Sequence, residues 1–211
     1  VNVPVLSEHI TDALPNVSTA GNFLTIAFLL TILCTPIART IVEAVTAEQL
    51  KANGAMAALL KDALKPLDSM YDYIIIDSPP ELGLISANIL VASNLVLIPA
   101  LCDFFSLQGV IQVHETINRI KQAINPELVL GGMFLCRYYP REELSRVARG
   151  TAAKLCENLN MTLLDTTIRH STVITNAMTA AQEDLIDFAP KNPVVKDYIA
   201  LVDELFERGL L

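Results

Sequence analysis

Residues 71–110 read YDYIIIDSPPELGLISANILVASNLVLIPALCDFFSLQGV, and this stretch decides the fold class. It contains an apolar strand pattern at residues 71–76, a helix pattern at 83–93 and a second strand pattern at 94–99. Strands that alternate with helices of this length predict βαβ units and a parallel sheet. We therefore expect an α/β fold with a mostly parallel sheet flanked by helices on both faces.

The rest of the chain continues the alternation of strands and helices. Further strands are expected at residues 22–28, 128–135 and 161–165. Further helices are expected at residues 5–14, at 37–64 with a break near Asn53 and Gly54, and at 105–124, 141–158 and 194–208. No repeat, linker or low-complexity tract interrupts the 211 residues, so a single domain over residues 1–211 is expected.

The composition favours a well-packed globular protein. Hydrophobic residues make up 52% of the chain and charged residues 18%, which suits strands buried in a core and excludes a disordered chain. The formal net charge is −8 at pH 7. Because dedicated nucleic-acid binders are usually basic, any contact with DNA would have to come from a local basic patch.

One segment offers such a patch. Its basic residues are Arg137, Arg141, Arg146, Arg149 and Lys154. Glu142 and Glu143 are interleaved with them, so the alternative interpretation is a set of solvated charges on a helix.

Neither the cysteines nor the most apolar segment indicates a specific function. The four cysteines have no C-x-x-C spacing, which predicts reduced, buried thiols in a cytosolic protein.

Residues 23–34 form an apolar run, but a bilayer-spanning helix needs about 20 such residues. A buried strand is expected there, and association with a membrane is the less favoured alternative.

The strand at residues 71–76 is followed directly by Asp77. In nucleotide hydrolases an acid in this position holds Mg²⁺, usually through water, because hard cations prefer oxygen ligands. A turn-forming role for Asp77 is the alternative on this motif alone.

Two other polar residues are not expected to be catalytic. Asp103 is expected to cap the helix that follows it, and His170 is expected to be a packing or surface residue.

Taken together, these segments resemble the ATPases of the ParA/MinD class, which carry a deviant Walker A loop. The family has a Walker B strand followed by D-x-P-P, a helix that begins near L-G, a V-L-I-P strand and an aromatic-rich loop, as in residues 71–110. FLCRYYPREELS at 134–145 and TTIRHSTVITNAM at 166–178 are similar to later family segments. The resemblance covers residues 71–208.

The resemblance implies an ATPase that segregates or positions DNA or another cargo. It implies ATP and Mg²⁺ as cofactors, a homodimer, a ParB-like or adaptor partner, non-specific DNA as a further partner, and a cytoplasmic, nucleoid-associated location. It implies that Asp77 is catalytic and holds the metal through water. The nucleotide would contact Pro140, Arg141 and Arg169, and weak DNA contacts would come from Arg137, Arg146 and Arg149.

The sequence also departs from the family pattern. No segment of the form K-G-G-x-G-K-T is present, and Gly131-Gly132 is followed by Met133 rather than by a lysine. The βαβ unit that carries the P-loop is therefore absent, and weak ATP binding is expected. Asn176 and Val173 replace a family Glu and a DNA-contacting basic residue. A non-hydrolysing scaffold and a MinD-like membrane-associated protein are the alternatives, although the acidic terminal helix disfavours the latter.

Overall fold

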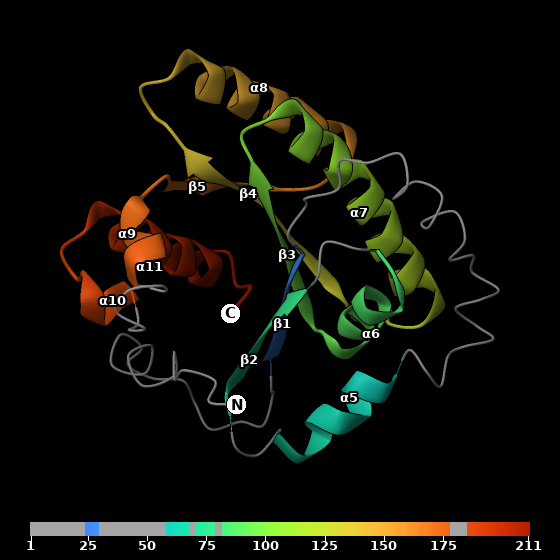
Figure 1. Ribbon diagram of the computed structural model, residues 1–211. Helices are drawn as coiled ribbons and strands as arrows, with labels where there is room; N and C mark the ends of the chain where they lie inside the picture. Colours follow the sequence, from blue (N-terminus) through green and yellow to red (C-terminus); the bar gives the residue numbers. More distant parts are fainter. Residues whose placement is uncertain (1–23, 30–57, 68–70, 79–81, 178–184) are drawn as a thin grey trace.

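The computed structural model describes most of the predicted α/β region (Figure 1). The described residues are 24–29, of which only the backbone is considered, 58–67, 71–78, 82–177 and 185–211. The helix predicted at 5–14, most of the helical segment predicted at 37–64, and Cys34 lie outside these residues.

A parallel sheet forms the centre of the fold, as expected (Figure 1). Its strands, in spatial order, are β2 (Tyr73–Ser78), β1 (Leu24–Leu29), β3 (Leu95–Leu101), β4 (Val129–Tyr138) and β5 (Leu163–Arg169). Every pair of neighbouring strands runs parallel. The carboxyl ends of all these strands therefore meet at one edge of the sheet.

Helices cover both faces of this sheet. They are α5 (Leu59–Leu64), the short 3-10 helix η1 (Lys65–Leu67), α6 (Leu84–Ala92), α7 (Phe104–Ala123), α8 (Glu143–Asn158), α9 (Thr172–Asn176), α10 (Leu185–Phe188) and α11 (Pro193–Glu207). Figure 1 shows α6 and α7 on one side of the sheet and α11 on the other. Within the described part of the chain, no helix combines the length and the apolar character needed to cross a membrane.

Two apolar clusters, one on each face, hold the layers together. Leu90 of α6 and Ile117 of α7 pack with Ile98 of β3 on the first face. On the second face, Leu97 of β3 packs with Leu205 of α11. Neighbouring residues of β3 thus point into opposite clusters, and residues 95–100 are buried throughout. Each such aliphatic side chain contributes about 1.5–3 kcal/mol of hydrophobic stabilisation.

Strand β2 differs from the buried strand that its apolar sequence suggests. It begins at Tyr73 and includes Asp77, and among the described strands it pairs only with β1. Its position at the edge leaves the side chain of Ile75 48% exposed. The expectation of strands buried on both faces thus holds for β3 and is wrong for β2.

Strands β4 and β5 are longer than predicted, because they remain paired as far as Tyr138 and Arg169. Gly132 of β4 lies at φ 129°, and a Cβ atom there would meet the carbonyl oxygen of Thr162 at 2.6 Å. Glycine is required at this position by the close approach of two backbones. The Gly131-Gly132 pair therefore serves the packing of the sheet.

Candidate functional site

The carboxyl edge of the sheet brings together the polar residues that the sequence singled out. Asp77 lies near the end of β2, Asp103 directly follows β3, Arg137 lies near the end of β4, and Arg169 ends β5. In open parallel sheets this edge is where ligands bind, because the loops that leave the strands form the crevice. Residues far apart in the sequence thus share one edge.

Asp77 has an exposed and unengaged carboxylate. Its side chain forms no hydrogen bond or ion pair with the described residues, and its backbone is paired in register with Phe28 of β1. No group of three or more potential metal-ligating side chains occurs in the described part of the chain. Mg²⁺ usually keeps several waters and needs only one or two carboxylates, so a lone acid at a strand end fits a water-mediated contact.

Asp103 is occupied as a helix cap, which confirms its predicted role. Its Oδ1 accepts a hydrogen bond from the backbone N–H of Ser106 at 2.8 Å, and its Oδ2 accepts one from the Ser106 hydroxyl at 2.7 Å. These two bonds hold the first turn of α7 against the end of β3. Asp103 therefore does not act as a second free acid beside Asp77.

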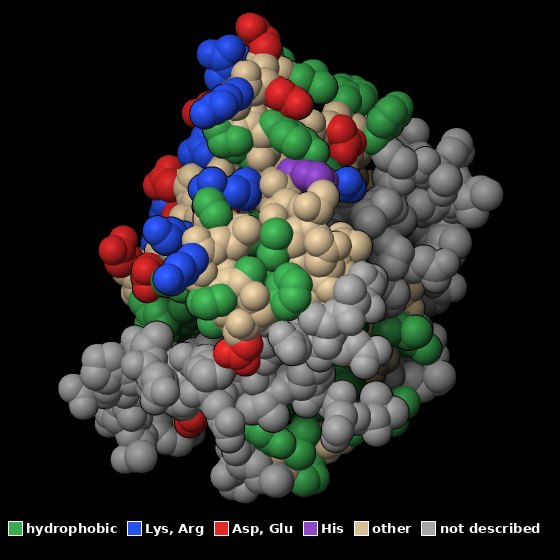
Figure 2. Space-filling model, turned by 60° about the vertical axis from the view of Figure 1, so that its left-hand side comes forward, with side chains coloured by type: hydrophobic (Ala, Val, Ile, Leu, Met, Phe, Trp, Pro, Cys, Tyr) green, Lys and Arg blue, Asp and Glu red, His purple; other side chains and the backbone are tan. Residues whose placement is uncertain are grey.

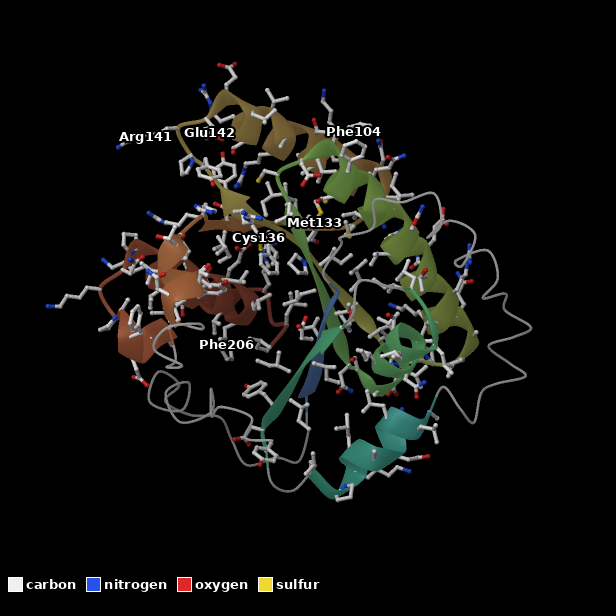
Figure 3. All side chains as sticks on the ribbon, in the orientation of Figure 1. Phe104, Met133, Cys136, Arg141, Glu142 and Phe206 are labelled. Carbon is white, nitrogen blue, oxygen red and sulfur yellow. The ribbon has the colours of Figure 1, made fainter. Side chains whose placement is uncertain are left out.

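Two arginines, one near the end of β4 and one in the loop between β4 and α8, form no ion pair with the described residues. Arg137 has φ 52°, in the left-handed region that residues other than glycine rarely adopt. Arg141 and Pro140 are exposed, and Figure 3 shows Arg141 pointing away from the sheet at the outer end of the loop. Among the described residues, neither Arg137 nor Arg141 has an acidic partner within salt-bridge distance.

The other predicted arginines are paired within the molecule. Their partners are Glu143 for Arg146 at 3.5 Å, Asp165 for Arg149 at 3.8 Å and Asp197 for Arg169 at 2.6 Å. Lys154 is exposed and has no ion pair in the described chain. Figure 2 shows basic and acidic side chains interleaved over one side of the molecule. The solvated-charge interpretation therefore fits Arg146 and Arg149 better than a basic patch does.

An aromatic pair that the sequence analysis did not predict lies beside the unpaired arginines. The ring of Tyr139 stacks on His170, with ring centroids 5.0 Å apart and an interplanar angle of 19°. Three hydrogen bonds fix the two loops: His170 N–H to Tyr138 O, Tyr139 N–H to Ser145 Oγ, and Glu142 N–H to Tyr139 O. His170 is thus a packing residue, as expected, but its partner could not be read from the sequence.

Exposed apolar side chains surround the same edge. They occur near the starts of the helices that follow β2, β3 and β4: Leu84 and Ile85 of α6, Phe104 and Phe105 of α7, and Leu144 and Val147 of α8. The two phenylalanine rings meet edge to face, with centroids 5.9 Å apart, and Phe104 is 71% exposed (Figure 3). We call these six residues the apolar rim. Exposed large apolar side chains can mark an interaction site, and Phe104 and Phe105 contact each other.

The described cysteines are unreactive thiols. Cys102, Cys136 and Cys156 are free thiols. Burial raises the pKa of Cys102 to about 11, of Cys136 to about 12 and of Cys156 to about 11. At neutral pH these residues carry protons, and the thiolate required of a nucleophile or a metal ligand does not form.

Comparison with known proteins finds similar proteins over part of the chain. A family model described as an AAA domain matches residues 35–130. The chromosome partitioning protein ParA of Myxococcus xanthus is 45% identical over 86 residues, which cover 41% of this chain and 30% of that protein. Over part of its length this chain is similar to ParA/MinD-type ATPases. An uncharacterized protein of Mycobacterium tuberculosis is 36% identical over 149 residues, or 71% of this chain and 46% of that protein.

Solved structures of ParA/MinD-type proteins share the fold. McdA of Cyanothece superposes with a TM-score of 0.63 at 19% identity, over 85% of this chain and 87% of that one. MinD of Pyrococcus furiosus superposes with a TM-score of 0.55 at 19% identity, over 72% of this chain and 58% of that one. The aligned region spans about half the length of the M. tuberculosis relative, 46%.

Proposed function

We propose that this chain acts in a ParA-type ATPase that segregates DNA or positions another cargo. The observation that carries the proposal is the exposed carboxylate of Asp77 at the carboxyl edge, which has no partner among the described residues and lies within a stretch similar to chromosome partitioning proteins. McdA has been solved in complex with ATP, and that structure shares the present fold at a TM-score of 0.62. ATP and Mg²⁺ are accordingly the proposed cofactors.

The residues at the edge divide into distinct roles. Asp77 would hold a hydrated Mg²⁺, and the ion would supply positive charge for the phosphate oxygens. Pro140 and Arg141 are available for the nucleotide because both are exposed, and Arg141 has no ion pair with another described residue. Arg169 is less available, since Asp197 occupies two of its nitrogens. A contact from Arg169 to the nucleotide remains a prediction.

These residues do not include the glycine-rich loop that usually binds the phosphates of ATP. The 211 residues contain no glycine-rich loop with a lysine, and Gly131 and Gly132 are buried within β4. Backbone N–H groups and a lysine normally hold the β- and γ-phosphates. Tight binding and hydrolysis therefore need a phosphate-binding loop in addition to the residues present.

The apolar rim supports self-association at the carboxyl edge. Side chains such as Ile85, at 65% exposure, and Leu144, at 70%, would be covered if two copies met edge to edge. We propose a homodimer of this kind, in the cytoplasm and on the nucleoid, with a ParB-like or adaptor protein as a further partner. Nothing in the described chain favours one cargo over another.

Calorimetry with ATP and Mg²⁺ tests the proposal in two steps. The chain itself should bind ATP weakly or undetectably; a dissociation constant near 1 μM, equivalent to about 8 kcal/mol, would demand a hidden phosphate site. A chimera with the Walker A segment of a family member placed before the chain should then hydrolyse ATP. A folded chimera that binds ATP without hydrolysing it would instead support the non-hydrolysing scaffold.

A further inference from the structure

The arginines of this protein fall into two groups. Five of those described form ion pairs within the molecule: Arg119, Arg146, Arg149, Arg169 and Arg208. Arg137 and Arg141 form none with the described residues, although both are exposed. In a chain with a net charge of −8, two exposed guanidinium groups have no acidic partner among the described residues, one near the end of β4 and one in the loop that follows it, and this indicates a site for an external anion.

An aromatic stack lies between these two arginines in the sequence. Tyr139 stacks on His170, and the residue is 39% exposed. Hydrogen bonds to Tyr138 and Ser145 hold both loops in place, so the surface is formed before any ligand arrives. Because the binding groups are already ordered, little conformational entropy is lost on association.

The combination of ring faces and guanidinium groups matches one kind of ligand. We propose that the surface formed by Arg137, Tyr139, Arg141 and His170 binds single-stranded nucleic acid in preference to duplex. Bases stack on aromatic side chains while basic groups follow the phosphates, and in a duplex the base faces are already covered by neighbouring pairs. The left-handed backbone of Arg137 adds to the argument, because such conformations concentrate at functional sites.

A single strand fits this surface better than a free nucleotide does. Stacking on an aromatic ring contributes about 1–3 kcal/mol per base, which alone corresponds to binding weaker than millimolar. The proposed contacts of Pro140 and Arg141 with a nucleotide need a phosphate-binding loop to hold the phosphates, and in its absence Arg141 is available to a strand. A strand, in contrast, presents successive phosphates to Arg137 and Arg141 while a base occupies the stack.

This inference rests on the proposed function only in assuming that the chain binds nucleic acid. It specifies that the nucleic acid is single-stranded. Fluorescence anisotropy with a labelled oligothymidylate of about 20 nucleotides and a duplex of equal length provides the test. The single strand should bind the full chain about tenfold more tightly than the duplex. Tyr139→Ala should weaken strand binding by about 5- to 100-fold, the equivalent of one lost stacking contact, and Tyr139→Phe should restore it.

Arginine variants and a matched control complete the design. The double variant Arg137→Ala, Arg141→Ala should weaken strand binding and reduce the slope of log affinity against log salt by about 1.4, as two phosphate contacts are lost. Arg146→Ala, which removes an exposed arginine already paired with Glu143, should change the affinity by less than about twofold. Circular dichroism confirms that each variant is folded.

Three results would overturn the inference: duplex bound as tightly as the single strand, no effect of Tyr139→Ala in a folded protein, or displacement of the strand by ATP at micromolar concentration. The last result would assign the stack to the base of a nucleotide. None of these results alters whether the Walker A chimera hydrolyses ATP. Failure of the strand preference can therefore be told apart from failure of the proposed ATPase function.

Discussion

The guanidinium of Arg169, at the end of β5, binds both carboxylate oxygens of Asp197 on α11. The Nε–Oδ2 distance is 2.6 Å and the Nη2–Oδ1 distance is 2.8 Å, and the backbone N–H of Arg169 donates to Oδ2 at 3.0 Å. The hydrogen bond to Asp197 raises the pKa of Arg169. This two-point contact joins α11 to the loop that begins with His170.

Breaking this pair should destabilise the fold and loosen that loop. We expect Arg169→Ala to lower the free energy of unfolding by about 1–2 kcal/mol, because the Asp197 side chain, 12% exposed, loses a charged partner. Urea denaturation measures the change, and Arg146→Ala is the control for an exposed pair. In the Walker A chimera, the predicted contact of Arg169 with the nucleotide means that Arg169→Ala should lower ATP affinity more than Asp197→Asn does. Equal effects of the two variants would limit Arg169 to its contact with α11.

Asn125, in the turn after α7, holds the carboxyl end of α6. Its side-chain amide donates to the carbonyl oxygens of Leu90, Val91 and Ser93 at 3.0, 3.3 and 2.8 Å, and the residue is 7% exposed. Asn125→Ala should lower the free energy of unfolding by about 1–3 kcal/mol, since buried carbonyl groups lose their donor. Asn125→Asp should cost more, because a carboxylate would face the same oxygens.

The matched control for Asn125 is Asn158→Ala, at an exposed asparagine near the end of α8. Its effect on thermal unfolding should stay within about 0.5 kcal/mol. Equal destabilisation by Asn158→Ala and Asn125→Ala would show that the contact with α6 contributes nothing specific.

Local sequence patterns predicted the helices and strands of the fold. They did not predict the order of the strands in the sheet. The alternation in residues 71–110 predicted β2, α6, β3 and α7, and Asp103 was identifiable as a cap because its hydrogen bond spans only three residues. The edge position of β2 depends on which strands lie beside it. That is a property of distant segments, and an apolar run such as Tyr73–Ile76 does not encode it.

The candidate site was predictable in its composition but not in its contacts. The sequence singled out Asp77 and the arginines, because motifs of the family contain them. The sequence did not show which arginines form ion pairs. Arg141 forms none with the described residues, whereas Arg169 pairs with Asp197, which is 28 residues away. Pairings of this kind form only when β5 and α11 pack together.

Glu204 of α11 is a buried acid that anchors the start of β5. Its two carboxylate oxygens accept hydrogen bonds from the backbone N–H groups of Asp165 and Thr166, each at 2.8 Å, and Arg208 donates to Oε1 at 2.8 Å. Burial alone would raise the pKa of Glu204. The hydrogen bonds outweigh burial and hold the pKa below its usual value.

This shift makes the stability of the protein depend on pH in the acidic range. A carboxyl group whose pKa is lower in the folded state stabilises the fold fully above its unfolded pKa of about 4.3, and the stabilisation is lost as pH falls through the folded pKa. Glu204→Gln should therefore lower the unfolding free energy by about 2 kcal/mol at pH 7, and the difference should shrink below about pH 4. Urea denaturation at several pH values measures it.

Glu207→Gln, at an exposed residue of the same helix, is the control and should leave the pH profile unchanged. A constant difference between wild type and Glu204→Gln from neutral to acidic pH would mean that ionisation of Glu204 does not contribute. In that case the contacts with Asp165 and Thr166 would act through packing alone.

Asp77 gives the most direct test of the chemistry, in the chimera that carries a Walker A segment. Asp77→Asn should lower the rate of ATP hydrolysis by about 100-fold or more, because the strand end no longer holds hydrated Mg²⁺ against the phosphates. The fold should persist, since the Asp77 side chain is exposed and forms no hydrogen bond or ion pair with the described residues. Asp72→Asn, at an exposed acid just before β2, is the matched control and should retain the full rate. If both variants hydrolyse ATP as fast as the parent chimera, Asp77 is an ordinary acid at the end of an edge strand, and the metal must be held elsewhere.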